Sequence, residues 1–251
     1  MLRSCRYSLI FALPLVGLFG RHDPASALTL RVAAAGQTLE IEDGGKFDRE
    51  KQTGTIRYEG GVGEVEVRLL LVEQTTPAKQ HSLTLSGVPG GEGPLPALTN
   101  AGEPGEIAVT FASSRFEAIG PRTRTAVRYQ GQITDVEDAR LALEVPENRL
   151  SATAGGKAAG EIRLAPVQSE GEESNFDSTS EAAELDGEVT NLSAVLRVNL
   201  GSGDALAIDE ARVATTALAA DTNLASLFGF GAAAVVILAA VVLFLRPRAR
   251  R

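Results

Sequence analysis

The segment "GEVEVRLLLVE", residues 63–73, decides the fold class of this 251-residue chain. Apolar side chains stand at every second position (Val65, Val67, Leu69 and Leu71), and charged side chains stand at the alternate positions Glu64, Glu66 and Arg68. Successive side chains of a β-strand point to opposite faces. The period of two therefore predicts a strand with one buried face.

The same alternation recurs through the body of the chain. Short examples are "LTLRV", "GTIRYEG", "HSLTLSGV", "GEIAVTFAS", "TAVRYQGQI", "GEIRLAP" and "AVLRVNL", separated by Gly, Pro and Asn. About ten short strands with no long amphipathic helix between them favour an all-β fold over a parallel α/β sheet. We therefore predict a β-sandwich over residues 28–201.

Three stretches interrupt this rhythm. In "DARLALEVPENRLSATA", residues 138–154, a Pro-Glu-Asn turn between two alternating runs predicts a hairpin. The Gly- and Pro-rich residues 86–105 predict a long loop or a seam between sub-domains, with the loop favoured. The acidic residues 168–188 predict a disordered loop, because a segment of few apolar residues and one sign of charge cannot order itself. A calcium site is the alternative, but the ligand spacing of a calcium loop is missing.

The C-terminal part predicts an anchored protein. Residues 202–226 predict a partly helical stalk, since Ser202 or Asp204 can cap a helix and apolar side chains follow at helical spacing. Residues 227–245 carry no charge. As a helix they would span about 28 Å, close to the hydrocarbon core of about 30 Å. One transmembrane helix is therefore expected there.

The flanking charges predict the orientation. Residues 1–27 have the order of a secretory signal peptide, with Arg3 and Arg6 before an apolar run and small residues at 25–27; an uncleaved anchor is the alternative. The basic tail, 246–251, should stay in the cytosol because positive residues favour that side. Its topology-setting residues are Arg246, Arg248, Arg250 and Arg251. A bacterial sorting signal ends in a similar way and remains open.

Composition narrows the possible chemistry. The only cysteine, Cys5, lies in the predicted signal peptide, which excludes disulfides and cysteine-ligated metals from the mature chain. Residues 28–245 carry a net charge of −14, which repels nucleic acid. His81 is the one histidine of that region, and a single strand histidine is typical of a surface or hydrogen-bonding residue rather than a general base. We expect no catalytic residue, metal ligand or cofactor.

One modification motif is present. Asn191, Leu192 and Ser193 form an N-glycosylation sequon, which would lie on the lumenal side in a eukaryotic cell. Chance occurrence of the motif is the alternative.

Residues 39–58, "LEIEDGGKFDREKQTGTIRY", resemble the opening of the lumenal domain in subunit 10 of the endoplasmic reticulum membrane protein complex. Glu40, Ile41, Asp43 and Phe47 carry this resemblance. The segments "DARLALEVPENRLSATA" and "DGEVTNLSAVLRVNL", followed by a stalk and one span, are similar in order to later elements of that family. The resemblance implies a non-catalytic type I subunit whose lumenal β-sandwich packs on other subunits of an insertase for transmembrane helices.

The expected function follows from placement and resemblance together. We expect a non-catalytic single-pass protein of the endoplasmic reticulum membrane, with most of the chain in the lumen. Its partners would be other subunits of the membrane complex, bound through the β domain and the span. The alternatives are a bacterial cell-envelope binding or adhesion module and, third, an envelope glycan hydrolase that uses two carboxylates.

Overall fold

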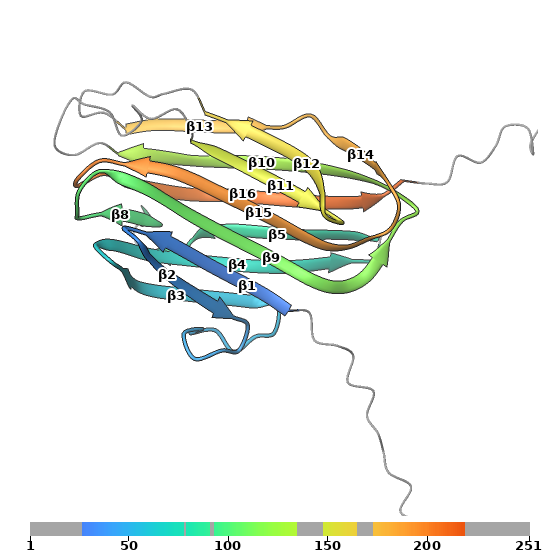
Figure 1. Cartoon of the computed structure of the whole chain (residues 1–251), viewed down its shortest axis with the longest axis horizontal. Coiled ribbons are helices and arrows are strands. Elements are labelled where there is room, and N and C mark those ends of the chain that lie inside the picture. Colours follow the sequence, from blue (N-terminus) through green and yellow to red (C-terminus); the bar gives the residue numbers. More distant parts are fainter. Residues whose placement is uncertain (1–26, 78, 91–92, 135–147, 165–172, 219–251) are drawn as a thin grey trace, which may run out of the picture.

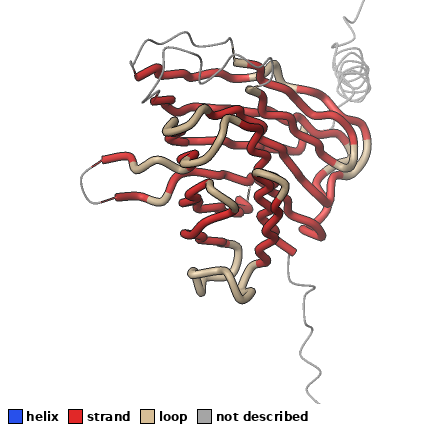
Figure 2. Tube along the Cα trace, turned by 60° about the vertical axis from the view of Figure 1, so that its left-hand side comes forward, coloured by secondary structure: helices blue, strands red, loops and turns tan. Residues whose placement is uncertain are grey.

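The computed structural model describes residues 27–77, 79–90, 93–134, 148–164 and 173–218. Within these ranges the chain forms β-strands and no helix. Two large antiparallel sheets face each other around one apolar core (Figure 1). This arrangement confirms the predicted β-sandwich, and Figure 2 shows that strands make up most of the described chain.

The first sheet, sheet A, has the strand order β12-β11-β15-β9-β1-β2. Strands far apart in sequence are therefore neighbours, since β9 pairs with both β1 and β15. The six strands are β1 (Ala27–Ala34), β2 (Gln37–Glu42), β9 (Gly105–Ile119), β11 (Arg149–Ala154), β12 (Lys157–Arg163) and β15 (Val189–Leu200).

The second sheet, sheet B, has the order β13-β10-β16-β5-β4-β3, with β14 on β10 and β8 between β16 and β4. Its strands are β3 (Thr55–Val62), β4 (Val65–Thr76), β5 (Gln80–Gly87), β8 (Leu98–Asn100), β10 (Arg122–Thr134), β13 (Glu173–Thr179), β14 (Ala183–Asp186) and β16 (Ala205–Ala217). A small third sheet pairs β6 (Pro89–Gly90) with β7 (Gly93–Pro94).

The core fills the space between the inner faces of sheets A and B. The segment 63–73 supplies β4, whose apolar side chains are buried at every second position as its alternation predicts. Leu69 and Leu71 are fully buried, and Phe111 of β9 lies in the same core from the opposite sheet. Burying such a side chain stabilises a fold by about 1.5–3 kcal/mol. Alternation along the strands thus decides which face turns inward.

The predicted helical stalk is wrong over residues 205–217, because these residues form strand β16 in the interior of sheet B. The ladder between β10 and β16 shifts at Gln130 and Gly131, so Asp209 is an extra residue on β16. A β-bulge of this kind displaces the alternation by one position. Leu206 and Ile208 are buried before the bulge, and Ala211 and Val213 after it, so the inward positions of β16 do not follow a single period of two.

The predicted disorder of residues 168–188 is wrong where the structure describes them. Residues 173–179 and 183–186 form β13 and β14, which both pair with β10. Arg128 of β10 lies 3.0 Å from Asp177, and Arg122 lies 3.3 Å from Glu184. The inward Phe176 packs against Tyr129 at a ring distance of 4.6 Å. A remote strand therefore supplies the positive charge and the apolar surface that the acidic segment lacks.

The loop and hairpin predictions are met in part, whereas the remaining ones fall on residues outside the described ranges. The 86–105 stretch is a connection that contains the short strands β6, β7 and β8. The second half of the predicted 138–154 hairpin is β11, and its hairpin partner is β12 across Gly155 and Gly156, whereas residues 135–147 lie outside the described residues. Residues 1–26 of the predicted signal peptide, the predicted span 227–245 and the basic tail also lie outside them. Among the described residues, no helix has the length and apolarity needed to cross a membrane.

Candidate functional site

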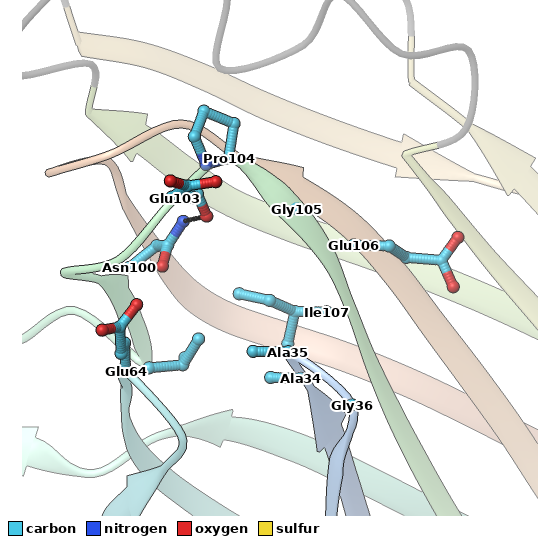
Figure 3. Close-up of a pocket in the computed structure, with 11 residues that line it drawn as sticks. Ala34, Ala35, Gly36, Glu64, Asn100, Glu103, Pro104, Gly105, Glu106 and Ile107 are labelled. Carbon is cyan, nitrogen blue, oxygen red and sulfur yellow. Dashed lines mark hydrogen bonds between the residues drawn. The ribbon is translucent and has the colours of Figure 1, made fainter.

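A surface hollow of about 400 Å³ lies at one end of the sandwich (Figure 3). Three segments enclose it: the turn between β1 and β2, the start of β4, and the connection from β8 into β9. Its lining residues include Ala34, Glu64, Asn100, Glu103 and Ile107. Residues from both sheets therefore meet at this pocket.

Asn100 holds the wall of the pocket in place. Its side chain is buried, and its Nδ2 lies 2.9 Å from the carbonyl oxygen of Glu103 and 3.0 Å from that of Leu200. Its Oδ1 accepts a hydrogen bond from the backbone N–H of Gly102 at 3.1 Å. A buried amide with its donors and acceptor paired fixes the surrounding backbone. The connection between β8 and β9 is thereby fastened to the end of β15.

The pocket is acidic. Glu64 and Glu103 contribute carboxylates to its lining, whereas the carboxylate of Glu106 extends away from them in Figure 3 and pairs with Arg197 at 2.6 Å. Carboxylates accept hydrogen bonds and attract cationic groups. The lining residues include no histidine, cysteine or hydroxyl side chain. In the part of the chain that the structure describes, no group of three or more His, Cys, Asp or Glu side chains could hold a metal ion.

A second polar site lies inside the sandwich around His81. The imidazole is fully buried on β5 and stacks on Phe116 with ring centroids 3.7 Å apart. Its Nδ1 lies 2.8 Å from the hydroxyl of Thr75. Its Nε2 lies 3.0 Å from Oε1 of Glu73, without the alignment of a hydrogen bond. The same carboxylate oxygen accepts a hydrogen bond of 2.5 Å from the hydroxyl of Ser113 on β9.

This cluster joins the two sheets, because Glu73 and His81 belong to sheet B and Ser113 belongs to sheet A. A nucleophilic serine needs a base at its hydroxyl. Here Ser113 donates to the carboxylate, and the imidazole contacts Thr75 instead. The arrangement is that of a buried polar bridge. His81 has the hydrogen-bonding environment expected of it, but it is buried and not at the surface.

The other predicted site residues lie apart from both places. Asn191 is half-buried in β15, opposite Ser114 of β9, beside an irregularity in the ladder. Arg246, Arg248, Arg250 and Arg251 lie outside the described residues.

Several residues of the two sites carry no signal in the sequence. Glu73 is the last residue of an alternating run, and Ser113 is 40 positions away from it. Asn100 reaches Leu200 across 100 positions. The one sequence feature that points toward the cluster is the position of Ser113. It is a polar residue that directly continues the inward apolar series of Ile107, Val109 and Phe111 in β9.

Comparisons with known proteins identify no family. No family model matches the chain, and no curated protein matches it. Among solved structures, the chain is similar to a Stig cyclase from Fischerella sp. TAU, with 14% identity, 58% of this chain and 80% of that chain covered, and a TM-score of 0.31.

Two further structures are similar at the same level. One is a PA14 sugar-binding domain from an RTX adhesin, with 8% identity and a TM-score of 0.30. The match covers 76% of this chain and 89% of the PA14 chain. The other is the mosquito-larvicidal Cry4Aa toxin from Bacillus thuringiensis, with 8% identity and a TM-score of 0.24. The match covers 78% of this chain and 43% of the toxin chain. TM-scores below 0.5 support no inference about the function of this chain.

Proposed function

We propose that this chain is a non-catalytic, single-pass membrane protein whose β-sandwich docks onto other subunits of a membrane-protein complex. The resemblance of residues 39–58 favours the endoplasmic reticulum membrane protein complex, with the sandwich in the lumen and residues 246–251 in the cytosol. The observation that carries the proposal is the outer face of sheet A.

The centre of that face is a flat platform of short side chains. Three cross-strand rows run over β1, β9, β15 and β11, and two of them are nearly free of charge. We define the platform by these two rows: Thr29, Ala112, Ser193 and Thr153, and Arg31, Thr110, Val195 and Ser151. The described strands form two large sheets, and sheet A turns its outer face toward the viewer in Figure 1.

The outer face of sheet B is different in charge. Arg128 lies between Asp177 at 3.0 Å and Glu210 at 3.4 Å, and Arg212 lies 3.7 Å from the same Glu210. Such exposed ion pairs contribute little to stability but keep a surface well solvated. The margin of the outer face of sheet A carries charges too, but the platform at its centre contains one, that of Arg31. The platform is therefore the better surface for a partner.

Short side chains suit a docking face for an energetic reason. Association must offset the conformational entropy of every side chain that it orders, about 0.5–1.5 kcal/mol for a side chain with many rotamers. Ala, Ser, Thr and Val have few rotamers to lose. A partner can also approach the sheet backbone closely over such residues. The platform thus binds a flat surface at a low entropic cost.

A matched pair of substitutions tests this proposal. Ala112 lies outward in the middle of the platform, and Ala214 lies outward in the middle of sheet B; both are half-buried. We would purify the tagged full chain from its own membranes in mild detergent and compare Ala112→Arg with Ala214→Arg on a native gel. The wild type and Ala214→Arg should migrate in a large complex, and Ala112→Arg should migrate alone.

The outcomes separate the possibilities clearly. A wild-type chain that migrates as a monomer would show that it is not a subunit of a stable complex. If Ala112→Arg stays in the complex as well as Ala214→Arg does, the docking face lies elsewhere.

The acidic pocket favours a second candidate, a binding module of a bacterial cell envelope. Glu64 and Glu103 could accept the donors of a small ligand there. Replacing both with Gln should abolish any such binding, and it should leave the complex of the first proposal unchanged.

A further inference from the structure

The connection between β2 and β3, residues 43–54, presents an exposed aromatic ring. Phe47 is 46% exposed. Among the described residues, the other exposed large apolar side chain is Leu95, at 39%. Isolated exposed apolar residues are ordinary on protein surfaces. What distinguishes Phe47 is the backbone that carries it.

One carboxylate organises this connection, which we call the Phe47 loop. Asp48 accepts hydrogen bonds from three backbone N–H groups: those of Gly44 at 2.9 Å, Glu50 at 2.9 Å and Arg57 at 3.0 Å. Hydrogen bonds to an ionised acceptor are about twice as strong as neutral ones. The residue next to Phe47 therefore fixes both sides of the loop.

The loop is also fastened at its base. Oδ2 of Asp43 accepts a hydrogen bond of 2.7 Å from the backbone N–H of Gly54. The carbonyl of Gly54 in turn accepts from the backbone N–H of Glu73 on β4, at 2.8 Å. Gly44 and Gly54 have φ values of 70° and 83°, a region that glycine adopts without steric cost. The loop thus holds its shape before anything binds.

A rigid backbone with an exposed aromatic ring is what a binding anchor needs. Aromatic side chains dominate interface hot spots when they enter a pocket on the partner. Preorganisation removes the entropy that a mobile loop would lose on binding. The ammonium of Lys46 lies 5.4 Å from the centroid of the Phe47 ring. Glu40 and Glu42 line the same surface hollow as Lys46 and Phe47. Lys46 therefore places one positive charge against the ring, within a surface of mixed charge.

We propose that the Phe47 loop is a docking element that inserts its ring into an apolar socket on a partner protein, with an acidic group of that partner opposite Lys46. This inference rests on the proposed function, because it names a second contact of the same β-sandwich with the complex. The loop starts directly after Glu42, the ladder partner of the platform residue Thr29. The two surfaces are therefore close enough for one partner to contact both.

A protein fits this loop better than a lipid surface does. The loop lies at the bottom of the sandwich in Figures 1 and 2, whereas β16 ends at the right-hand side of Figure 1. The loop is therefore apart from the end of the described chain. The net charge of −14 on residues 28–245 also repels anionic lipid.

The test compares Phe47 with the other exposed apolar residue. Phe47→Ala, Leu95→Ala and Asp48→Ala are made in the tagged full chain, and the fraction bound to the complex is measured across a dilution series in mild detergent. We expect Phe47→Ala to weaken binding at least tenfold and Leu95→Ala to leave it unchanged. Asp48→Ala retains the ring but loses three hydrogen bonds, so it should weaken binding severalfold. Thermal unfolding of each variant checks that the sandwich is intact.

A photo-crosslinking arm separates failure of this inference from failure of the proposed function. The probe is p-benzoylphenylalanine at position 47, with the same probe at position 95 as control. A discrete protein adduct at 47 alone that Asp48→Ala abolishes supports the docking element even if the complex dissociates in detergent. Intact binding of Phe47→Ala to a complex that the wild type forms overturns it. No adduct, or an adduct with lipid, also overturns it.

Discussion

Removing the hydroxyl of Ser113 tests the buried bridge between the two sheets. Ser113 is 1% exposed, and the Glu73 side chain that accepts its hydrogen bond is 8% exposed. A hydrogen bond to a charged acceptor contributes about 1.5–3 kcal/mol. Glu73 has other contacts, including His81 at 3.0 Å, so Ser113→Ala does not leave its charge alone. We expect Ser113→Ala to lower the free energy of unfolding by about 2 kcal/mol.

The assay is urea and thermal unfolding of the full chain in mild detergent. In a domain of this size, about 2 kcal/mol corresponds to a fall in Tm of about 4–8 °C. Ser193→Ala is the matched control, because Ser193 lies on a neighbouring strand of the same sheet and its hydroxyl is 2.7 Å from that of Thr153. That neutral, half-buried pair should contribute no more than about 1 kcal/mol.

Two results would refute the reasoning. One is an equal loss of stability in Ser113→Ala and Ser193→Ala. The other is simple additivity of Ser113→Ala and Glu73→Gln in a double-mutant cycle, since residues in one hydrogen-bond network couple by about 0.5–3 kcal/mol.

Three further predictions concern titration, packing and topology. Burial raises the pKa of Tyr129 far above its ordinary value, so above pH ~10 the folded chain keeps the phenol proton that the unfolded chain loses. The free energy of unfolding should therefore fall by about 1.4 kcal/mol per pH unit in that range. In urea titrations at several pH values, Tyr129→Phe should remove this contribution to the pH dependence. In Gly131→Ala the new Cβ would overlap the carbonyl oxygen of Ala207, so we expect a loss of about 1–3 kcal/mol by calorimetry, whereas Gly61→Ala, whose new Cβ would meet no atom beyond its chain neighbours closer than 3.8 Å, should be nearly neutral. Protease added to sealed microsomes should remove only residues 246–251, and endoglycosidase should shift the wild type but not Asn191→Gln; digestion of the sandwich by the external protease would contradict the predicted orientation.

Much of the sandwich can be predicted from local alternation. Segment 63–73 becomes β4 with its apolar side chains inward, as its period of two indicates. The prediction is wrong for β16, because the extra residue Asp209 interrupts the period of two that would have indicated a strand. It is also wrong for β13, where Asp177 finds its counter-charge on Arg128, 49 positions away. Local patterns carry no information on a bulge or on a partner strand that is distant in sequence.

The sites are harder to predict than the strands. Phe47 stands in a segment that the sequence already singles out, but its exposure depends on Asp48 meeting the backbone N–H of Arg57. The acidic pocket needs Glu64 and Glu103 to come from two separate connections. The polar bridge needs two sheets to bring Glu73 and Ser113 to hydrogen-bonding distance.

The sequence by itself determined the side-chain alternation, the acidic charge of the body and the absence of a thiol after Cys5, because these depend on the order of residues alone. Only the tertiary structure decided which strands are neighbours, and with them the platform, the His81 bridge and the conformation of the Phe47 loop. The physical reason is that cross-strand pairing joins residues as far apart in the sequence as Gln80 and Thr216. Burial and hydrogen bonding act on that spatial arrangement, whereas periodicity acts only on neighbours along the chain.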